Sequence, residues 1–282
     1  MGGKAGSRRV YCQAVATNRV AGSVRRVAVS AGLAVVMTGV LAAQWIRHPT
    51  DGIPRTKDGR PDLSAPVPRA ADGKPVLTGL WRPSPGIVGD ITRGLRGGNV
   101  PYQPWAETLF RSRVANDSRD DPTAKCVVGG VPRSNFVGYP FKILQVPGMV
   151  VILYEAIHSY RQIFTDGRSL PADPNPAWFG YSVGRWDGDT FVVDTAGFND
   201  NVWLDNLGRP ATAQLRVTER FVRRDFGRMD IDITIDDPKA YTRPWTVTQS
   251  LAFQPDTELL EYICDENNKY FQIIPKQDDS RR

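Results

Sequence analysis

Four ionisable side chains lie in or beside apolar runs, where burial would favour proton chemistry. Glu155 ends the run VVILYE, Glu219 lies inside VTERF, and Asp194 lies inside TFVVDTA. A carboxyl group in such surroundings has a raised pKa unless it is paired, which suits it to act as a general acid or base. We take Asp194, Glu155, Glu219 and Arg161 as candidate catalytic residues. As an alternative, Glu155 and Arg161 form a structural ion pair at the mouth of the strands.

The segment 181–205 adds candidates for ligand binding. The Asp-Gly dipeptide at 187–188 predicts a two-residue hairpin turn, which would place Tyr181 opposite Asp194. One hairpin face is then apolar, and the other mixes apolar side chains with Arg185 and Asp194, as the wall of a ligand cavity does. The alternative is an outer barrel face covered by the N-terminal part of the chain. Tyr181 and Arg185 are therefore candidate ligand-binding residues.

Three further candidates lie in loops. Asp200 and Trp203 follow the hairpin, where the rim of a barrel would lie, and Arg133 closely follows Cys126. Two carboxylates about 5–9 Å apart can hydrolyse a glycoside, and Trp203 could stack on its sugar. Aspartates in such loops mostly form turns and caps instead. Asp200, Trp203 and Arg133 complete the set of candidate ligand-binding residues.

The composition disfavours several kinds of site. The chain has two histidines, His48 and His158, too few for a histidine-rich zinc site, and it has no G-x-S-x-G motif for a serine nucleophile. The loop GLRGGN at 94–99 lacks the Lys-Ser/Thr ending of a phosphate loop, and the Asp and Asn spacing in 194–205 does not match an EF-hand. We expect neither a metal nor a cofactor.

The first 43 residues have the pattern of an export signal. They carry six Lys and Arg and no acid, and they end in an uncharged run over 27–43 that finishes in small residues. We expect a signal peptide over 1–43, with an uncleaved anchor helix as the alternative. The protein would then be periplasmic or secreted, by the Sec route or, given the paired arginines, by the twin-arginine route.

Removal of the signal leaves a formally neutral chain. The whole chain has 36 Lys and Arg; less the six in the signal this leaves 30, equal to the 30 Asp and Glu. A neutral chain gives no reason to expect nucleic acid as a partner, or a membrane except through an uncleaved signal. The expected partner is a small-molecule ligand or substrate.

Two of the three cysteines remain after the signal. In an oxidising compartment, Cys126 and Cys264 suggest one disulfide that would join the start of the β-rich region to its end. The alternative is two separate buried thiols.

From residue 141 onward the sequence predicts strand after strand. The clearest is 229–236, where Met and Ile alternate with Asp and Thr. Short turns and the lack of helical crossovers predict an antiparallel up-and-down barrel, lipocalin-like, with a two-sheet β-sandwich as the alternative. Strands are expected at 141–146, 149–155, 160–165, 179–186, 190–196, 215–224, 229–236, 245–253 and 258–264.

The remaining segments flank this barrel. Residues 44–101 are rich in Pro and Gly and predict an extended arm packed on the domain. Within the arm, DGRPDLSAP at 58–66 and DGKPVLTGL at 72–80 form a small repeat. A helix is predicted near 103–116, with Pro104 in its first turn. The β-rich domain then covers 102–274, including this helix, and a polar tail covers 275–282.

Several motifs together resemble a family of uncharacterised exported bacterial proteins. They are DGKPVLTGLW, DPTAKC, GYSVGRWDGDTFVVDTAGFND and TIDDPKAYTRPW. The resemblance covers nearly all of the chain after the signal. It implies export, pairing of Cys126 with Cys264, and one β-rich domain, and it implies no reaction.

We therefore expect an exported β-barrel that binds a small molecule in a partly apolar cavity. The first alternative is a hydrolase, lyase or isomerase that uses carboxylates with Arg and Tyr on a glycoside or a hydroxylated apolar compound. The second alternative is a structural protein of the envelope. The sequence leaves open whether the protein is an enzyme.

Overall fold

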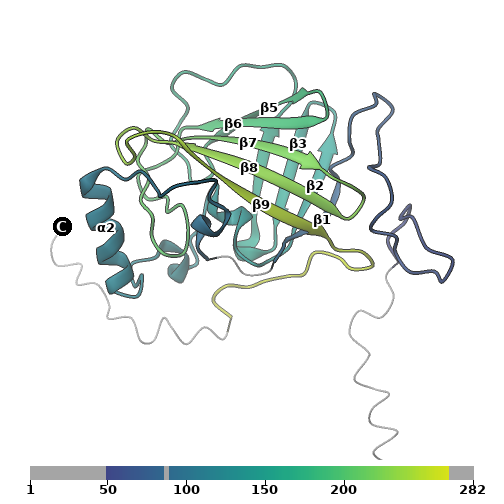
Figure 1. The fold of residues 1–282 in the computed structure, drawn as a ribbon, viewed down its shortest axis with the longest axis horizontal. Coiled ribbons are helices and arrows are strands. Elements are labelled where there is room, and N and C mark those ends of the chain that lie inside the picture. The colour runs from purple at the N-terminus through teal and green to yellow at the C-terminus, as the bar shows by residue number, and fades with distance from the viewer. Residues whose placement is uncertain (1–48, 86–88, 267–282) are drawn as a thin grey trace, which may run out of the picture. The chain divides into compact units, whose positions relative to one another are not determined.

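The computed structural model of the protein describes residues 49–85 and 89–266, so the expected signal peptide (1–43) and polar tail (275–282) lie outside the described residues. Nine strands form one closed barrel whose neighbours follow chain order (Figure 1). The expected mainly β, lipocalin-like barrel is confirmed, and the two-sheet sandwich is wrong. The strands are β1 Gly79–Pro83, β2 Phe141–Val146, β3 Met149–Tyr154, β4 Ser159–Phe164, β5 Tyr181–Asp187, β6 Thr190–Ala196, β7 Arg216–Arg223, β8 Arg228–Asp236 and β9 Trp245–Phe253.

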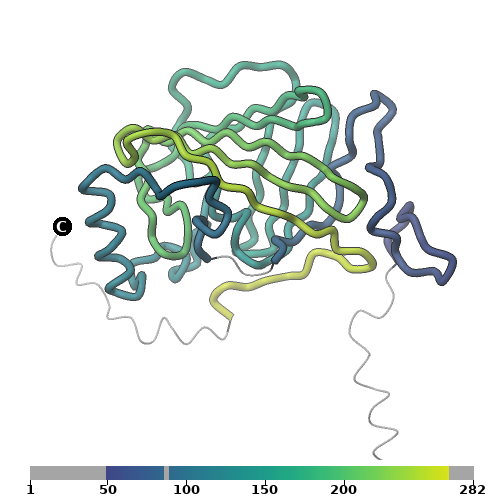
Figure 2. The backbone as a smooth tube through the Cα atoms, in the orientation of Figure 1, coloured from purple at the N-terminus to yellow at the C-terminus, as the bar shows by residue number. Residues whose placement is uncertain are grey.

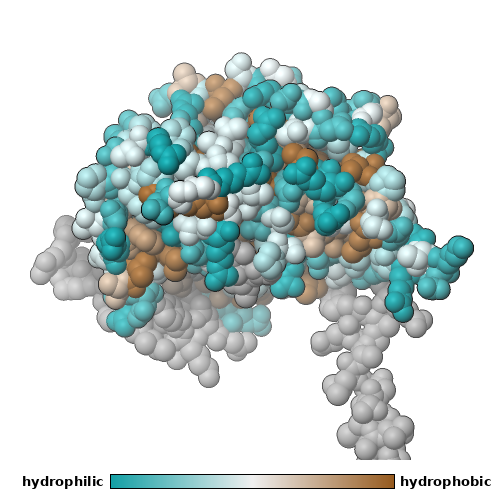
Figure 3. Space-filling view, viewed as in Figure 1, coloured by the Kyte–Doolittle hydropathy of each residue, from teal (hydrophilic) through white to brown (hydrophobic). Residues whose placement is uncertain are grey.

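Side chains that alternate along the strands fill the barrel. In β8, Ile231 and Ile233 are buried, whereas Asp230 and Asp232, which alternate with them, keep contact with solvent. The face over β7, β8 and β9 is mostly hydrophilic, with hydrophobic residues in scattered groups (Figure 3). Large aromatic side chains from the other strands complete the core: Trp81, Phe141, Phe191 and Phe221. The interior is therefore a packed core, as in other small barrels.

One strand comes from the segment that was expected to be an irregular arm. β1 pairs with β2 through Trp81 and Phe141 and with β9 through Trp81 and Phe253, and so closes the barrel. The strand predicted at 258–264 is not formed. Its absence has a simple reason, because β1 already occupies the free edge of β9. The prediction of an arm over 44–101 therefore needs this correction at its C-terminal part.

The prediction of purely antiparallel pairing is also corrected at one place. Strands that alternate in direction around a ring must be even in number, so a closed ring of nine needs one parallel pair. That pair is β4 and β5, joined at Ile163 with Ser182 and Phe164 with Val183. The chain between them, 165–180, runs back along the barrel to make the parallel pairing possible.

The β5–β6 hairpin differs from its expected register. Asp187 pairs with Thr190, so the turn is Gly188-Asp189 and not Asp187-Gly188. Val183, and not Tyr181, lies opposite Asp194. Because the register shifts by two residues, each side chain keeps the face that the sequence assigned to it.

One α-helix is described, α2 Pro104–Ala115, at the expected position. It packs against the β8–β9 loop, where Trp105 Nε1 donates to Lys239 O at 2.8 Å. Trp105 remains 46 % exposed. Phe110, on another side of the helix, stacks on Tyr102. Four short 3-10 helices complete the described elements: η1 Ile91–Gly94, η2 Pro122–Lys125, η3 Arg133–Asn135 and η4 Ala156–His158.

The small repeat forms two copies of the same turn. PRTKDGRP at 54–61 and PRAADGKP at 68–75 each fold back so that the arginine reaches the glycine carbonyl, at 3.1 Å in the first copy and 2.8 Å in the second. Each of these guanidiniums also donates two hydrogen bonds to one aspartate. Arg55 binds Asp256, which follows β9, and Arg69 binds Asp189 in the β5–β6 turn. We call residues 49–78 the strap, which lies beside one end of the barrel (Figure 2).

The guanidinium of Arg223 packs between the strap and the aromatic side chains at this end of the barrel. Arg223 lies over the rings of Trp81, Phe226 and Phe253, at 4.9, 5.0 and 5.9 Å from their centres. It donates to the carbonyls of Val76 on the strap and of Asp225 and Phe226 on the β7–β8 turn. Burial lowers the pKa of Arg223 to about 10. The strap and Arg223 together close this end of the barrel.

The attachment of the strap is expected to depend on pH. The hydrogen bonds from Arg55 and Arg69 lower the pKa values of Asp256 and Asp189 below the ordinary value of 3.8. The gripping contacts are therefore fully present above about pH 4 and are lost as the pH falls through the lowered values. A carboxyl carbon NMR titration measures both midpoints. In Arg69→Ala we expect the Asp189 midpoint to rise while the Asp256 midpoint stays low; two unchanged midpoints would contradict the assignment.

Candidate functional site

Two of the candidate catalytic residues form a closed ion pair inside the barrel. Arg161 Nη2 of β4 lies 2.5 Å from Glu219 Oε2 of β7, and both side chains are almost fully buried. Arg161 is therefore paired with Glu219, and the alternative of an ion pair between Arg161 and Glu155 is wrong. Asn135 in η3 donates to the second Glu219 oxygen at 2.7 Å and accepts from the Tyr154 hydroxyl at 3.0 Å.

This buried cluster extends to two more strands, β5 and β6. Arg161 Nε donates to Ser182 Oγ at 3.1 Å, and Nη2 donates to Thr195 Oγ1 at 2.8 Å. Its remaining Nη1 has no partner among the described residues. Burial lowers the pKa of Arg161, but the Glu219 carboxylate outweighs it and the net direction is upward. Burial raises the pKa of Tyr154. Both groups thus keep their protons at neutral pH, which suits a structural role rather than proton transfer.

The mixed face of the β5–β6 hairpin lies on the outside of the barrel. Arg185 pairs with Asp194, which also accepts from Thr218 Oγ1 at 2.8 Å. The Arg185 side chain is 61 % exposed. Tyr181 accepts from Arg168 at 3.0 Å and stacks on Phe164. These residues form a solvated outer surface, and not the wall of an inner cavity.

The loop candidates are engaged in local contacts. Asp200 Oδ1 accepts from the backbone N–H of Ala213 at 2.7 Å. Trp203 is 4 % exposed, and the guanidinium of Arg113 lies 4.2 Å from its ring centre. That ring face is therefore covered and is not free to stack on a sugar.

A groove of about 670 Å³ opens on the outer side of β1. Its walls come from β1, the chain from η2 through η3 to β2, the start of η4, Asn206, and the chain after β9. The lining includes the apolar side chains of Leu80, Val137 and Leu260 and the polar side chains of Arg82, Glu155 and Gln254. Such a mixture and such a volume are typical of sites for small molecules. We call this hollow the groove.

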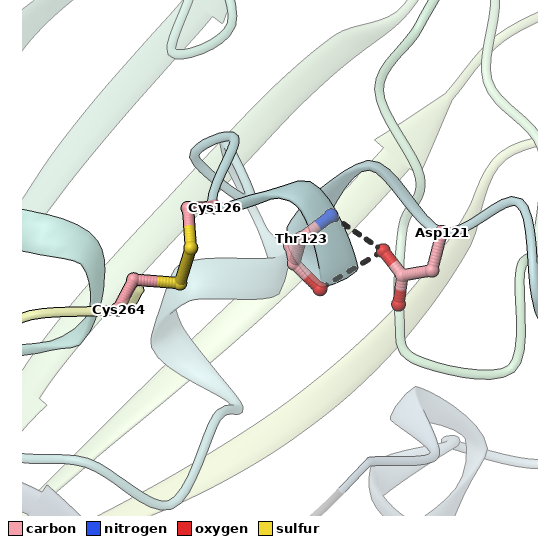
Figure 4. The surroundings of a disulfide bond; sticks show 4 residues. All are labelled: Asp121, Thr123, Cys126 and Cys264. Carbon is pink, nitrogen blue, oxygen red and sulfur yellow. Dashed lines mark hydrogen bonds between the residues drawn. A yellow bond between two sulfur atoms is a disulfide. The ribbon is translucent and has the colours of Figure 1, made fainter. Parts of the chain in front are cut away.

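The last candidate, Arg133, holds one wall of the groove in place. Its guanidinium grips both oxygens of Asp121, at 2.8 and 2.5 Å, and donates to Asn206 at 2.8 Å. Asp121 in turn caps η2 by accepting from Thr123 N at 2.8 Å (Figure 4). Arg133 is only 3 % exposed, so it positions the wall and has little surface left for a ligand.

One free guanidinium faces the groove. Arg82 Nε donates to Gly138 O at 3.1 Å, and its two terminal nitrogens have no partner among the described residues. The acids on the walls are already engaged: Asp121 with Arg133, Glu258 with Lys142 at 2.7 Å, and Glu155 with the backbone of Leu260 at 3.1 Å. Within the described residues, the terminal nitrogens of Arg82 are thus charged donors that these acids leave unpaired.

The backbone of the groove wall is unusual at η4. Ile157, which lines the groove, has φ 57°, and His158 has φ 39°. The left-handed region is costly for a β-branched residue such as Ile157. Backbone of this kind persists where the surrounding structure holds it and is concentrated at functional sites. The backbone conformation of η4 therefore favours the groove as the candidate functional site, independently of the side chains that line it.

The chain after β9 covers part of the groove. Its last described residues are tied to η2 by the Cys126–Cys264 disulfide, with the two Cα atoms 5.7 Å apart (Figure 4). The expected pairing of these cysteines is therefore confirmed. Tyr262 on this chain packs against Tyr139 across the groove, with ring centres 5.1 Å apart.

Comparison with known proteins adds no assignment: no family model matches the chain, and no curated protein matches its sequence. Within 49–85 and 89–266, no group of three or more His, Cys, Asp or Glu side chains is placed to hold a metal ion. The same described residues include no helix that is long and apolar enough to cross a bilayer.

Proposed function

We propose that this protein is an exported binding protein that holds a small, partly apolar molecule with an acidic group in the groove. The observation that carries the proposal is the guanidinium of Arg82, whose terminal nitrogens are free, on groove walls whose other charged side chains are already engaged. The apolar body of the ligand would lie against Leu80, Val137 and Leu260, and its acidic group would reach Arg82.

The placement of the candidate acids favours binding over catalysis. Glu219 is locked to Arg161, Asp194 lies on the outer face, and Asp200 lies in a separate loop. Of the four candidate acids only Glu155 lines the groove, and the other acids on its walls, Asp121 and Glu258, are paired with Arg133 and Lys142. Acid–base hydrolysis of a glycoside needs two carboxyl groups about 5–9 Å from each other, on either side of the bond that is cleaved. The dispersal of these residues therefore supports a binding protein.

Export is part of the proposal. The disulfide between Cys126 and Cys264 supports an oxidising compartment, and the uncharged run at 27–43 supports a signal peptide. Cell fractionation with mass spectrometry of the mature N-terminus tests this part. Recovery of the full-length chain from the reducing cytoplasm, with free thiols, would overturn it.

Arg82→Gln is expected to weaken binding of an acidic probe by about tenfold or more. A hydrogen bond to a charged group contributes about 1.5–3 kcal/mol, and 1.4 kcal/mol is a factor of ten. Fluorescence titration with anilinonaphthalene sulfonate measures this affinity, and neutral phenylnaphthylamine should bind the variant and the original protein equally.

The matched control is Arg220→Gln. Arg220 lies on the outer side of β7, paired with Asp187 at 2.9 Å, so its loss should leave both probes unaffected. Lack of saturable binding of either probe to the intact protein would overturn the proposed function. Equal loss for both probes in Arg82→Gln would overturn the acidic class of ligand.

A further inference from the structure

The chain that covers the groove is held in an unusual way. We call Thr257–Cys264 the lid. Its inward backbone N–H groups donate to side chains: Leu260 N to Glu155 at 3.1 Å and Tyr262 N to His158 Nε2 at 3.2 Å. Among the described residues, no backbone-to-backbone hydrogen bond joins 257–263 to another segment. Within the described residues, the contacts that attach the lid involve side chains, including the Glu258–Lys142 ion pair and the Tyr262–Tyr139 ring contact, whereas the strands are joined by continuous backbone ladders.

The two ends of the lid are held in different ways, one by hydrogen bonds to the strap and the other by the disulfide. At its start, the turn at Asp256 (φ 55°) is held by Arg55 and by Thr50 of the strap. At its end, Cys264 is bonded to Cys126, next to the groove-lining part of η2. Leu260 and Ile263 between these ends are 41 % and 45 % exposed. Apart from the contact of Tyr262 with Tyr139, little apolar burial therefore holds the middle of the lid.

The barrel itself does not need the disulfide to close. β9 is joined to β8 along eight residue pairs from Arg228 to Ile235, and β1 is joined to both β2 and β9. The disulfide lies outside these ladders, since Cys126 and Cys264 are in loops. Its direct mechanical effect falls on the lid and on the η2 wall.

We propose that the Cys126–Cys264 disulfide is a redox latch on the groove. The inference rests on the proposed function, because it concerns ligand exchange at that same site. With the bond intact, the lid stays over the groove and exchange is slow. A dithiol reductant transfers two electrons and two protons to the bond, which leaves two thiols in the protein and one disulfide in the reductant. The lid is then tied at one end only, and the ligand exchanges rapidly.

Neither cysteine is in the barrel core. Cys126 and Cys264 are each only partly buried and lie in loops, so a small dithiol would not have to open the barrel to reach the bond. Exchange of thiols with a disulfide requires this access. The latch therefore responds to its surroundings while the ligand is bound.

The test compares probe release from the oxidised protein, the protein treated with dithiothreitol, and Cys126→Ser/Cys264→Ser. Stopped-flow fluorescence of phenylnaphthylamine gives the dissociation rate. We expect both forms without the bond to release the probe at least tenfold faster than the oxidised protein. Hydrogen exchange should show faster exchange at 257–266 with little change in β7, β8 and β9.

The outcomes separate the two proposals. Saturable probe binding with equal release rates in all three forms would overturn the latch and leave the proposed function standing. Lack of saturable binding in the oxidised protein would overturn the proposed function. Unfolding of the barrel on reduction would overturn the latch too, because the disulfide would then be a staple of the whole domain.

Discussion

Replacing Glu219 with alanine is expected to lower the free energy of unfolding by about 3–5 kcal/mol. The substitution leaves Arg161 charged and 2 % exposed inside the barrel, without its partner. A buried charge that loses its counter-ion carries the full cost of its lost hydration, which the remaining bonds to Ser182 and Thr195 only partly offset. Urea denaturation at neutral pH, followed by tryptophan fluorescence, measures the difference.

Two further variants make this result specific. Asp194→Ala breaks an ion pair with Arg185 that is exposed on the outer face, so it should cost no more than about 1 kcal/mol. Arg161→Met with Glu219→Leu removes both charges and should recover most of the loss, since apolar replacements of a buried pair are often neutral. A loss in Glu219→Ala no larger than that in Asp194→Ala would contradict the buried pair.

Trp81→Ala is expected to cost about 3–5 kcal/mol, the range for deletion of a large aromatic side chain from a core. Trp81 is 0 % exposed, meets Phe253 edge-on at 5.3 Å, and lies beneath the guanidinium of Arg223. Its loss would leave a void at the place where β1 closes the barrel. Thermal and urea unfolding measure the change.

The matched control for this prediction is Trp105→Ala. Trp105 lies on α2, is 46 % exposed, and makes one hydrogen bond to Lys239. Its replacement should cost less than about 1 kcal/mol, as surface substitutions do. Equal losses in the two variants would mean that β1 is not an integral strand.

The parts of the fold that the sequence predicted are those with a local signal. The alternation of Met and Ile with Asp in 229–236 depends only on which face each residue occupies, so β8 was predicted correctly. β1 was missed because its five residues lie in a stretch rich in Pro and Gly, and its partners β2 and β9 are far along the chain. The turn of the β5–β6 hairpin was placed one residue early because Asp-Gly and Gly-Asp both suit a hairpin turn.

The candidate site was less predictable than the strands, because its residues are brought together by contacts between segments far apart in the chain. Burial of Glu219 followed from its position in an apolar strand, but its partner Arg161 is set by which strands face each other across a closed barrel. The groove has walls from several segments distant in sequence, so no local pattern marked Arg82. The repeat offered one unused signal: the arginine that precedes each Asp-Gly turn, Arg55 and Arg69, is the residue that fixes the strap.

The single parallel pair gives the buried ion pair a further meaning. From β5 through β9 and on through β1 to β4, the barrel is one antiparallel sheet rolled until its two edges meet. That seam has only two residue pairs, the fewest of any neighbouring strands. Arg161 crosses it from the inside, from β4 to Ser182 of β5 and onward to Glu219 of β7. The salt bridge thus joins strands on the two sides of the seam, at the place where the barrel has the fewest backbone hydrogen-bonded pairs.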